Sequence, residues 1–261
     1  MGKNEIRRPR WHTHYLQLPS LSGRRILAVT TVQAAKDHRI AWVTGAGKGI
    51  GRQLALRLAE EGWIVAASSR TEADLKDLEA ACPSHLIRGF PLDVTQAADT
   101  EEVVQQIETA LGPLDLVVLN AGTHLPMPAS EFSTAIFRRL VDTNLMGTVH
   151  GLSTIIPPMI ARKSGRILVV ASLAGYRGLP TAAAYGATKA ALINMCEALR
   201  PELGKKGVVL QLINPGFIKT PLTDKNKFLE DFRNHSGGCP VMVSAMAVSY
   251  THLTLPTNRE V

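Results

Sequence analysis

The sequence predicts an α/β fold built on a single doubly wound parallel sheet with helices on both of its faces. From residue 39 onward, short β-branched runs alternate with longer amphipathic runs. The short runs are almost continuously apolar, as expected of strands that are covered on both faces. A glycine-rich turn also joins the first short run directly to the first amphipathic run.

The expected elements alternate along the chain. The expected strands are 39–44, 63–68, 86–90, 115–119, 166–171 and 208–213. The expected helical stretches lie near 50–61, 72–81, 97–111, 134–162 and 182–204. Because strand–helix alternation produces right-handed βαβ units, we expect the strands to run parallel in one sheet.

The regular pattern bounds one domain, which we expect to span residues 39–227. Residues 1–38 mix Arg-rich and Pro-containing pieces without a period and are expected to form a disordered basic extension. Residues 228–261 do not continue the alternation, and the stretch 248–261 resembles a translated sequencing-library adapter. We therefore expect an aberrant or truncated C-terminal tail.

Composition excludes several classes of protein. The formal net charge is +7, but residues 1–38 carry +5 of it, so the remaining chain is close to neutral and nucleic acid is not an expected partner. Three scattered cysteines without a C-x-x-C pair favour neither a metal site nor a disulfide framework, and they fit a reducing cytoplasm. No apolar run approaches the roughly 20 residues that cross a bilayer, so no membrane partner is expected.

The glycine-rich turn covers residues 44–51 (TGAGKGIG). Glycines let the backbone turn tightly and approach a diphosphate, and the following helix N-terminus supplies free N–H groups for that anion. A glycine-rich turn without a ligand is the alternative, but the strand before it and the helix after it favour a Rossmann-type nucleotide site.

The end of the second expected strand, Ser68-Ser69-Arg70, favours NADP(H) over NAD(H). An acid at this position would bind the ribose 2′-hydroxyl, whereas Arg70 offers forked donors to a 2′-phosphate. Lys48 in the glycine turn approaches the same side. The alternative is that both are solvated surface charges.

A serine, a tyrosine and a lysine form the candidate reacting centre. Ser172 is expected to end a buried strand, and Tyr185 and Lys189 are four residues apart on an expected helix, hence on one face. A free tyrosine has a pKa of ~10, and we expect the Lys189 ammonium to lower it towards neutrality. Ser172 would donate a hydrogen bond to the substrate oxygen. The alternative is an amphipathic helix pair and an unrelated strand-end hydroxyl.

The G-x-x-x-G-x-G turn, the Tyr-x-x-x-Lys pair and the Ser-to-Tyr spacing of 13 residues resemble the short-chain dehydrogenase/reductase family, in its NADP-preferring form. The resemblance covers residues 39–227. It implies hydride transfer between NADP(H) and a carbonyl or secondary alcohol, with Tyr185 as acid/base.

Four further segments carry the resemblance. Residues 92–95 match the adenine-contacting segment, and 120–122 match one that lines the cofactor, although Leu119 replaces the first of two usual asparagines. Asn144 matches the residue that holds a proton-relay water, and 214–220 match the turn that orients the nicotinamide. The catalytic residues implied are Asn144, Ser172, Tyr185 and Lys189. The cofactor residues implied are Thr44, Gly45, Lys48, Gly49, Ile50, Gly51, Arg70, Asp93, Val94, Asn120, Ala121, Gly122, Tyr185, Lys189, Pro215, Gly216, Ile218 and Thr220.

The expected function is therefore an NADP(H)-dependent oxidoreductase acting on a small-molecule carbonyl or alcohol. Reduction of 3-oxoacyl thioesters is an alternative within the family, and a non-enzymatic nucleotide-binding sensor or scaffold is an alternative of another class. We expect a cytoplasmic location and, with the native C-terminus, a homo-oligomer. His124, just after the 120–122 turn, is interpreted as a loop histidine without a role, and the alternative is that it faces the substrate.

Overall fold

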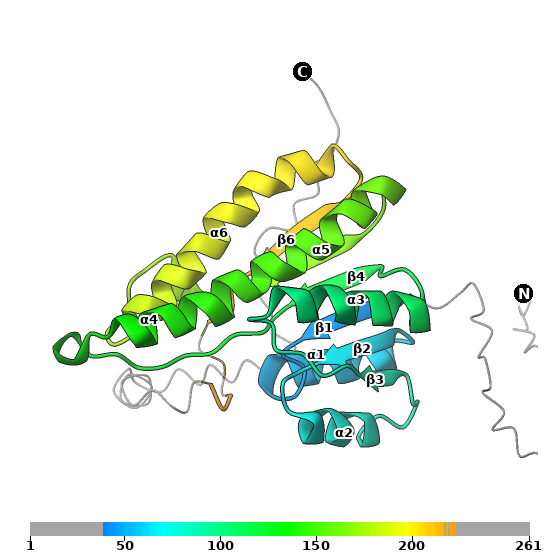
Figure 1. Cartoon of the computed structure of the whole chain (residues 1–261), viewed down its shortest axis with the longest axis horizontal. Helices are drawn as coiled ribbons and strands as arrows, with labels where there is room; N and C mark the ends of the chain where they lie inside the picture. The colour runs from blue at the N-terminus through cyan, green and yellow to red at the C-terminus, as the bar shows by residue number, and fades with distance from the viewer. Residues whose placement is uncertain (1–38, 217, 219, 223–261) are drawn as a thin grey trace, which may run out of the picture. The chain divides into compact units, whose positions relative to one another are not determined.

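The computed structural model describes residues 39–216, 218 and 220–222. The expectations for residues 1–38 and 228–261 lie outside the described residues. The described part contains one six-stranded parallel sheet with the strand order β3-β2-β1-β4-β5-β6, and helices lie against it (Figure 1). The predicted doubly wound α/β fold is confirmed.

All six expected strands are present, and each begins and ends within one residue of its predicted bounds. The strands are β1 (Ile40–Thr44), β2 (Ile64–Ser68), β3 (Ile87–Gly89), β4 (Leu116–Leu119), β5 (Arg166–Val170) and β6 (Val209–Ile213). The helices are α1 (Gly49–Glu60), α2 (Glu72–Ala80), α3 (Ala97–Leu111), α4 (Thr134–Leu140), α5 (Gly147–Arg162) and α6 (Ala183–Gly204).

The structure corrects two local expectations. The stretch 134–162 is not one continuous α-helix, because the π-helical segment η2 (Val141–Met146) separates α4 from α5. A π-turn adds a residue without disturbing the apolar character of a helix, so apolar spacing does not reveal it. In addition, Ser172 does not end a strand: β5 stops at Val170, and Ser172 starts the short 3-10 helix η3 (Leu173–Gly175).

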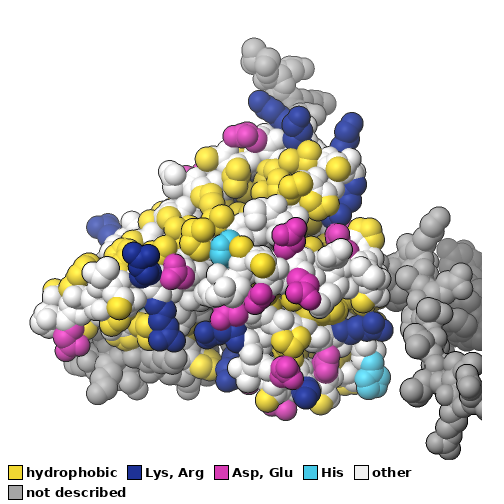
Figure 2. Space-filling view, in the orientation of Figure 1, with side chains coloured by type: hydrophobic (Ala, Val, Ile, Leu, Met, Phe, Trp, Pro, Cys, Tyr) yellow, Lys and Arg dark blue, Asp and Glu magenta, His cyan; other side chains and the backbone are white. Residues whose placement is uncertain are grey.

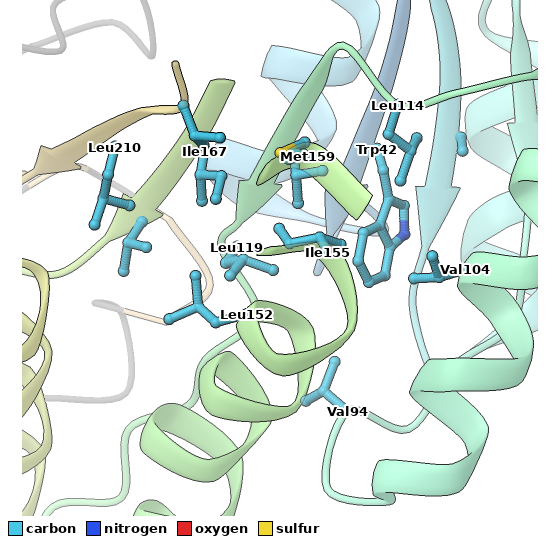
Figure 3. Packing of buried hydrophobic residues seen from close by; sticks show 14 of the residues in the cluster. Trp42, Val94, Val104, Leu114, Leu119, Leu152, Ile155, Met159, Ile167 and Leu210 are labelled. Atoms are coloured by element: carbon cyan, nitrogen blue, oxygen red, sulfur yellow. The ribbon is translucent and has the colours of Figure 1, made fainter. Parts of the chain in front are cut away.

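The side chains of β1 divide the core into two layers. Ile40 and Trp42 belong to the cluster packed under α3, α5 and α6, whereas Ala41 and Val43 belong to the cluster under α1 and α2. This division follows from the alternation of side chains along a strand. The Trp42 ring packs near Ile155 in the first layer (Figure 3), and its buried indole N–H donates to Ser68 Oγ at 2.9 Å.

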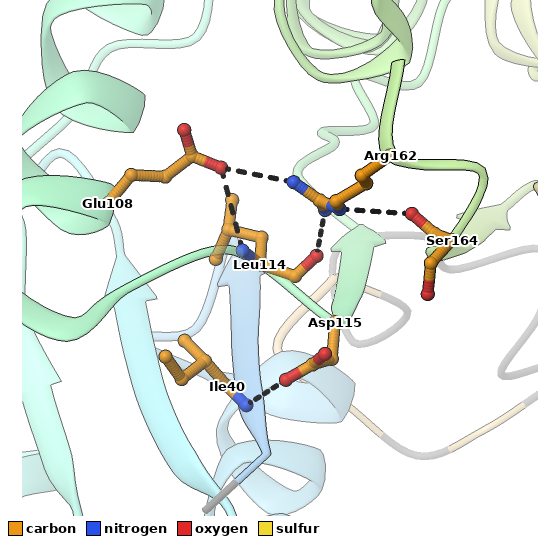
Figure 4. Close-up of polar contacts among 6 residues, drawn as sticks. All are labelled: Ile40, Glu108, Leu114, Asp115, Arg162 and Ser164. Carbon is orange, nitrogen blue, oxygen red and sulfur yellow. Dashed lines mark hydrogen bonds and ion pairs between the residues drawn. The ribbon is translucent and has the colours of Figure 1, made fainter. Parts of the chain in front are cut away.

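The amino end of the sheet is closed by polar contacts, here called the amino-end network. Its members are Ile40, Glu108, Leu114, Asp115, Arg162 and Ser164 (Figure 4). The Ile40 N–H donates to Asp115 Oδ2 at 2.8 Å, which joins the starts of β1 and β4. Arg162, at the end of α5, donates to the Leu114 carbonyl and lies 3.6 Å from Glu108 Oε1 on α3.

The surface divides by side-chain type. Hydrophobic side chains gather over α5 and α6, whereas acidic and basic side chains are interspersed over α2 and α3 (Figure 2). Within the described ranges, no helix combines the length and the apolar character that crossing a membrane requires.

Candidate active site

Two cavities open at the carboxyl ends of the central strands, where the chain leaves β1 and β4 towards opposite sides of the sheet. Such a switch point is where α/β sheets bind ligands. The turn cavity, lined by the glycine turn, has a volume of about 380 Å³. The tyrosine cavity, lined by Tyr185, has a volume of about 230 Å³. The two cavities adjoin, because they share five lining residues, and together they are called the cleft. The shared residues are Ile50, Asn120, Gly122, Thr220 and Leu222.

The glycine turn has the backbone geometry of an anion cradle. Gly45 and Gly49 have φ values of 65° and 57°, a region that favours glycine. A Cβ on Gly51 would lie 2.4 Å from the Gly45 carbonyl oxygen, so only glycine lets α1 begin this close to the turn. Lys48, the N-cap residue of α1, makes no capping hydrogen bond with its side chain, and the N-terminus of α1 borders the turn cavity, where it favours an anion.

Thr44 and Asn120 fix the end of β1 to the end of β4. Thr44 Oγ1 accepts hydrogen bonds from the Asn120 and Ala121 N–H groups at 3.0 and 3.1 Å. The Asn120 amide in turn donates to the carbonyl oxygens of Thr44 and Gly45 at 3.0 and 3.2 Å. Thr44 and Gly51 are both buried and line neither cavity, so they act behind the wall that the glycine turn and Asn120 form.

The far end of the turn cavity carries both expected cations. Arg70 is exposed and lines it, and Lys48 Nζ lies 3.2 Å from Asp74 Oδ2. Asp74 is in the first turn of α2, as expected of a helix-capping acid, but it also lines the cavity, which the sequence analysis missed. Asp93 and Val94 line it as expected, with Asp93 Oδ1 accepting from the Thr95 N–H at 3.0 Å. The other lining residues that were not among the predicted cofactor residues are Gly47, Ser69, Thr71, Leu92, Thr123, Thr143, Pro221 and Leu222.

Ser172, Tyr185 and Lys189 meet at the tyrosine cavity. Lys189 is only 4% exposed; its Nζ donates to the Val170 carbonyl at 2.8 Å and lies 5.7 Å from the centroid of the Tyr185 ring. Burial lowers the pKa of Lys189 to about 8. Ser172 Oγ accepts from the Ala174 N–H at 3.1 Å, which fixes the hydroxyl at the start of η3.

The pKa of Tyr185 moves in the direction opposite to the prediction. Burial raises it, and a hydrogen bond with Ser172 opposes that rise. The expected lowering by Lys189 is absent, and the removal of the phenol from water sets the direction of the shift. The Lys189 ammonium is itself desolvated and directed at a backbone carbonyl.

Asn144 lies in η2, fully buried behind the cleft, and lines neither cavity. Its side chain accepts from the Thr123 N–H at 2.7 Å and donates to the Thr123 carbonyl at 2.9 Å and to Thr188 Oγ1 at 3.2 Å. A Cβ on Gly122 would lie 3.4 Å from Asn144 Oδ1 and 3.6 Å from Lys189 Nζ, so both residues border Gly122. The side chain of Asn144 thus braces the loop after β4.

The tyrosine cavity contains residues that the sequence analysis missed or discounted. His124 is buried and its ring lies edge-on to Tyr185 with centroids 5.0 Å apart. Arg177 lines the same cavity from the segment between η3 and α6. Proximity to the 120–122 turn was the one signal for His124, and no motif marked Arg177. The expected residues Pro215, Gly216 and Ile218 line this cavity, and Thr220 lines both.

The chain is similar to known proteins in both sequence and structure. A family model described as short chain dehydrogenase matches residues 39–230. An uncharacterized oxidoreductase of Myxococcus xanthus (strain DK1622) is 42% identical over 197 residues, covering 75% of this chain and 78% of that protein. The structure of ElxO with NADP bound has a TM-score of 0.68 at 30% identity and covers 75% of this chain and 80% of that one. A variant of actinorhodin polyketide ketoreductase with NADPH has a TM-score of 0.71 at 29% identity, covering 78% and 79%.

Proposed function

The chain belongs to the short-chain dehydrogenase family and is an oxidoreductase of that family, and we propose that it reduces a small-molecule carbonyl with NADPH, using Tyr185 as the acid. The observation that carries the proposal is that the two cavities of the cleft adjoin. Ser172, Tyr185 and Lys189 line one end of it, and the glycine turn lines the other.

The residues present fit a dinucleotide. The glycine turn and the N-terminus of α1 would hold the diphosphate, and Asp93 and Val94 would face the adenine. The backbone of Ile218 and the hydroxyl of Thr220 would orient the nicotinamide. When bound, the nicotinamide supplies or accepts the hydride.

The side chains of the tyrosine cavity would handle the proton. Ser172 would donate a hydrogen bond to the carbonyl oxygen, and Tyr185 would transfer its proton to the same oxygen as the carbon gains the hydride, which yields an alcohol and a tyrosinate. Lys189 would stabilise that tyrosinate. A phenol of ordinary pKa is already protonated at neutral pH, and burial raises the pKa of Tyr185 further, so the hydroxyl carries the proton that reduction requires.

We attribute a preference for NADPH over NADH to Arg70 and Lys48. No acid stands at the tip of β2, Arg70 is exposed beside the turn cavity, and two structural neighbours contain NADP or NADPH. Replacing Arg70 by Gln should lower kcat/KM for NADPH about 10-fold and change that for NADH little, because one charge-assisted contact to the 2′-phosphate is lost. An equal loss with both cofactors, or none, would contradict this assignment.

Oxidation of NADPH against a panel of ketones, aldehydes and sugars tests the proposal. A non-enzymatic sensor would bind NADPH and reduce none of them, and its binding would survive Tyr185→Phe. The panel should include an N-acetylcysteamine 3-oxoacyl thioester, because one structural neighbour is a polyketide ketoreductase. A thioester reduced far faster than every small carbonyl would select that alternative.

We also propose a homo-oligomer in the cytoplasm. The hydrophobic side chains gathered over α5 and α6 offer an area that a second copy can bury (Figure 2). The two cysteines within the described part, Cys82 and Cys196, are buried free thiols, which suits a reducing compartment. Light scattering at several protein concentrations tests the assembly, and a monomer at all of them would refute it.

A further inference from the structure

The wall of the tyrosine cavity carries a positive charge that the proposed chemistry does not use. The described residues that line this cavity include the cations Lys189 and Arg177 and no Asp or Glu. Lys189 is buried and hydrogen-bonded to Val170, within the reacting centre. Arg177 is exposed, so it lies on the solvent side of the same cavity.

The segment that carries Arg177 is fixed on both sides. Before it, Gly175 packs so closely against α6 that an added Cβ would lie 2.6 Å from Ile193 Cδ1. After it, the Met127 N–H donates to the Thr181 carbonyl at 2.8 Å. A cation on a fixed segment meets a ligand at a smaller cost in ordering than one on a mobile loop.

Arg177 is available to a ligand and is separated from the phosphates of the cofactor. The ion pairs found between described residues use other cations, namely Lys48, Arg57, Lys76 and Arg162. Arg177 lines the tyrosine cavity and does not line the turn cavity, where the diphosphate and 2′-phosphate would lie. Its planar guanidinium presents paired donors that match the oxygens of a carboxylate or a phosphate.

The remaining wall sets the shape and polarity of the ligand. Its apolar members are Ile50, Val170, Ala171, Leu173, Ala174, Leu179, Ala182, Pro215, Ile218 and Leu222. Apolar walls of low dielectric strengthen the field of a nearby cation. The cavity of about 230 Å³ lies below the ~300–1,000 Å³ of most ligand pockets, and the nicotinamide would take the part of it beside Ile218 and Thr220, so the space left suits a compact molecule.

We propose that the substrate is a compact oxo-acid, in which an apolar body separates the reacting carbonyl from an oxyanion that pairs with Arg177. The inference rests on the proposed function, because Tyr185 and Ser172 are what locate the carbonyl end. Arg177 is then the residue that sets specificity for anionic over neutral carbonyl compounds.

Matched substrate pairs test the inference. The kcat/KM values of 5-oxohexanoate and its methyl ester, and of hydroxyacetone phosphate and hydroxyacetone, are measured for the full chain and for Arg177→Met. The wild type should prefer at least one anionic member, and Arg177→Met should lower that anionic-to-neutral ratio about 10- to 100-fold, mainly through KM. The pair that responds identifies the oxyanion as a carboxylate or a phosphate. Arg177→Lys should keep part of the preference.

The control variant is Arg139→Met, which removes an exposed arginine of α4 that lines neither cavity and should leave both ratios unchanged. Ratios that Arg177→Met does not change, or a wild-type preference for the neutral members, would overturn the inference.

Thermal stabilisation by hexanoate and by inorganic phosphate, measured with NADPH present, gives a readout without turnover. At least one of these two anions should raise the thermal midpoint of the wild type and have little effect on that of Arg177→Met. Equal rises in the midpoints of the wild type and the variant would count against the inference. If no carbonyl compound is reduced, the proposed function fails, and the thermal measurement still shows whether Arg177 binds an anion.

Discussion

The two ends of the sheet use similar side chains in opposite ways. At the amino end, Asp115 accepts from a backbone N–H, and Arg162 contacts a backbone carbonyl and the carboxylate of Glu108. The partners of these charged groups are therefore other groups of the protein (Figure 4). At the carboxyl end, Arg177, Tyr185 and Lys189 line a cavity. The same strands β1, β4 and β5 lead to both ends. The contrast teaches that a charged or polar side chain contributes to stability where the protein itself supplies its partners, and to chemistry where a cavity leaves room for a ligand.

The substitution Tyr185→Phe, at the carboxyl end of the sheet, should have the largest effect on activity and little effect on stability. Losing the proton donor should lower kcat about 10²- to 10⁴-fold, the usual contribution of a general acid. The substitution keeps the ring and removes one hydroxyl that is desolvated and hydrogen-bonded to Ser172, so the thermal midpoint should change little from that of the wild type. Steady-state kinetics and thermal unfolding of the same preparation measure both effects. Retained activity would remove Tyr185 from the chemistry.

The candidate site was predictable where it depends on local spacing. Tyr185 and Lys189 share a face because they are one helical turn apart, and the turn glycines follow from backbone conformations that only glycine adopts readily. Both signals are present in a few consecutive residues. The strands were predictable for a similar reason, since each is a short apolar run.

The features that were missed depend on burial or on contacts between distant segments. Asp74 and Arg177 reach the two cavities only because α2 and the segment after η3 pack beside them. The raised pKa of Tyr185 depends on how completely the fold excludes water, which residue spacing does not specify. The π-helical turn that holds Asn144 leaves no mark on the apolar pattern of 134–162.

The next largest effect is expected on the free energy of unfolding, to which the buried amino group of Lys189 makes a contribution that depends on pH. Its pKa falls from 10.5 to about 8 in the folded state, so between these values the unfolded chain binds more protons than the folded one. The contribution of Lys189 to stability therefore rises with pH across this window and is flat below it. Replacement by Met removes the titration. The free energy of unfolding of the wild type minus that of Lys189→Met should increase by up to about 3 kcal/mol from pH 8 to 10.5.

Urea unfolding at a series of pH values measures this difference. Lys205→Met, at an exposed position after α6, serves as the control, and its difference from the wild type should change little over the same range. A difference for Lys189→Met that is equally flat would show that the ammonium is better solvated than its burial indicates.

The smallest effect, and the one that tests the amino end directly, is expected from Arg162→Met. The substitution keeps an apolar stem against the protein but removes the donors to the Leu114 and Ser164 carbonyls and the cation near Glu108. Arg162 is partly exposed, so water can replace some of these contacts, and the expected loss is about 1–2 kcal/mol of unfolding free energy. Because the amino-end network lies at the opposite end of the strands from the cleft, kcat and KM at 25 °C should remain those of the wild type. A fall in kcat without a fall in stability would mean that the two ends of the sheet are coupled, and the division of labour between them would have to be abandoned.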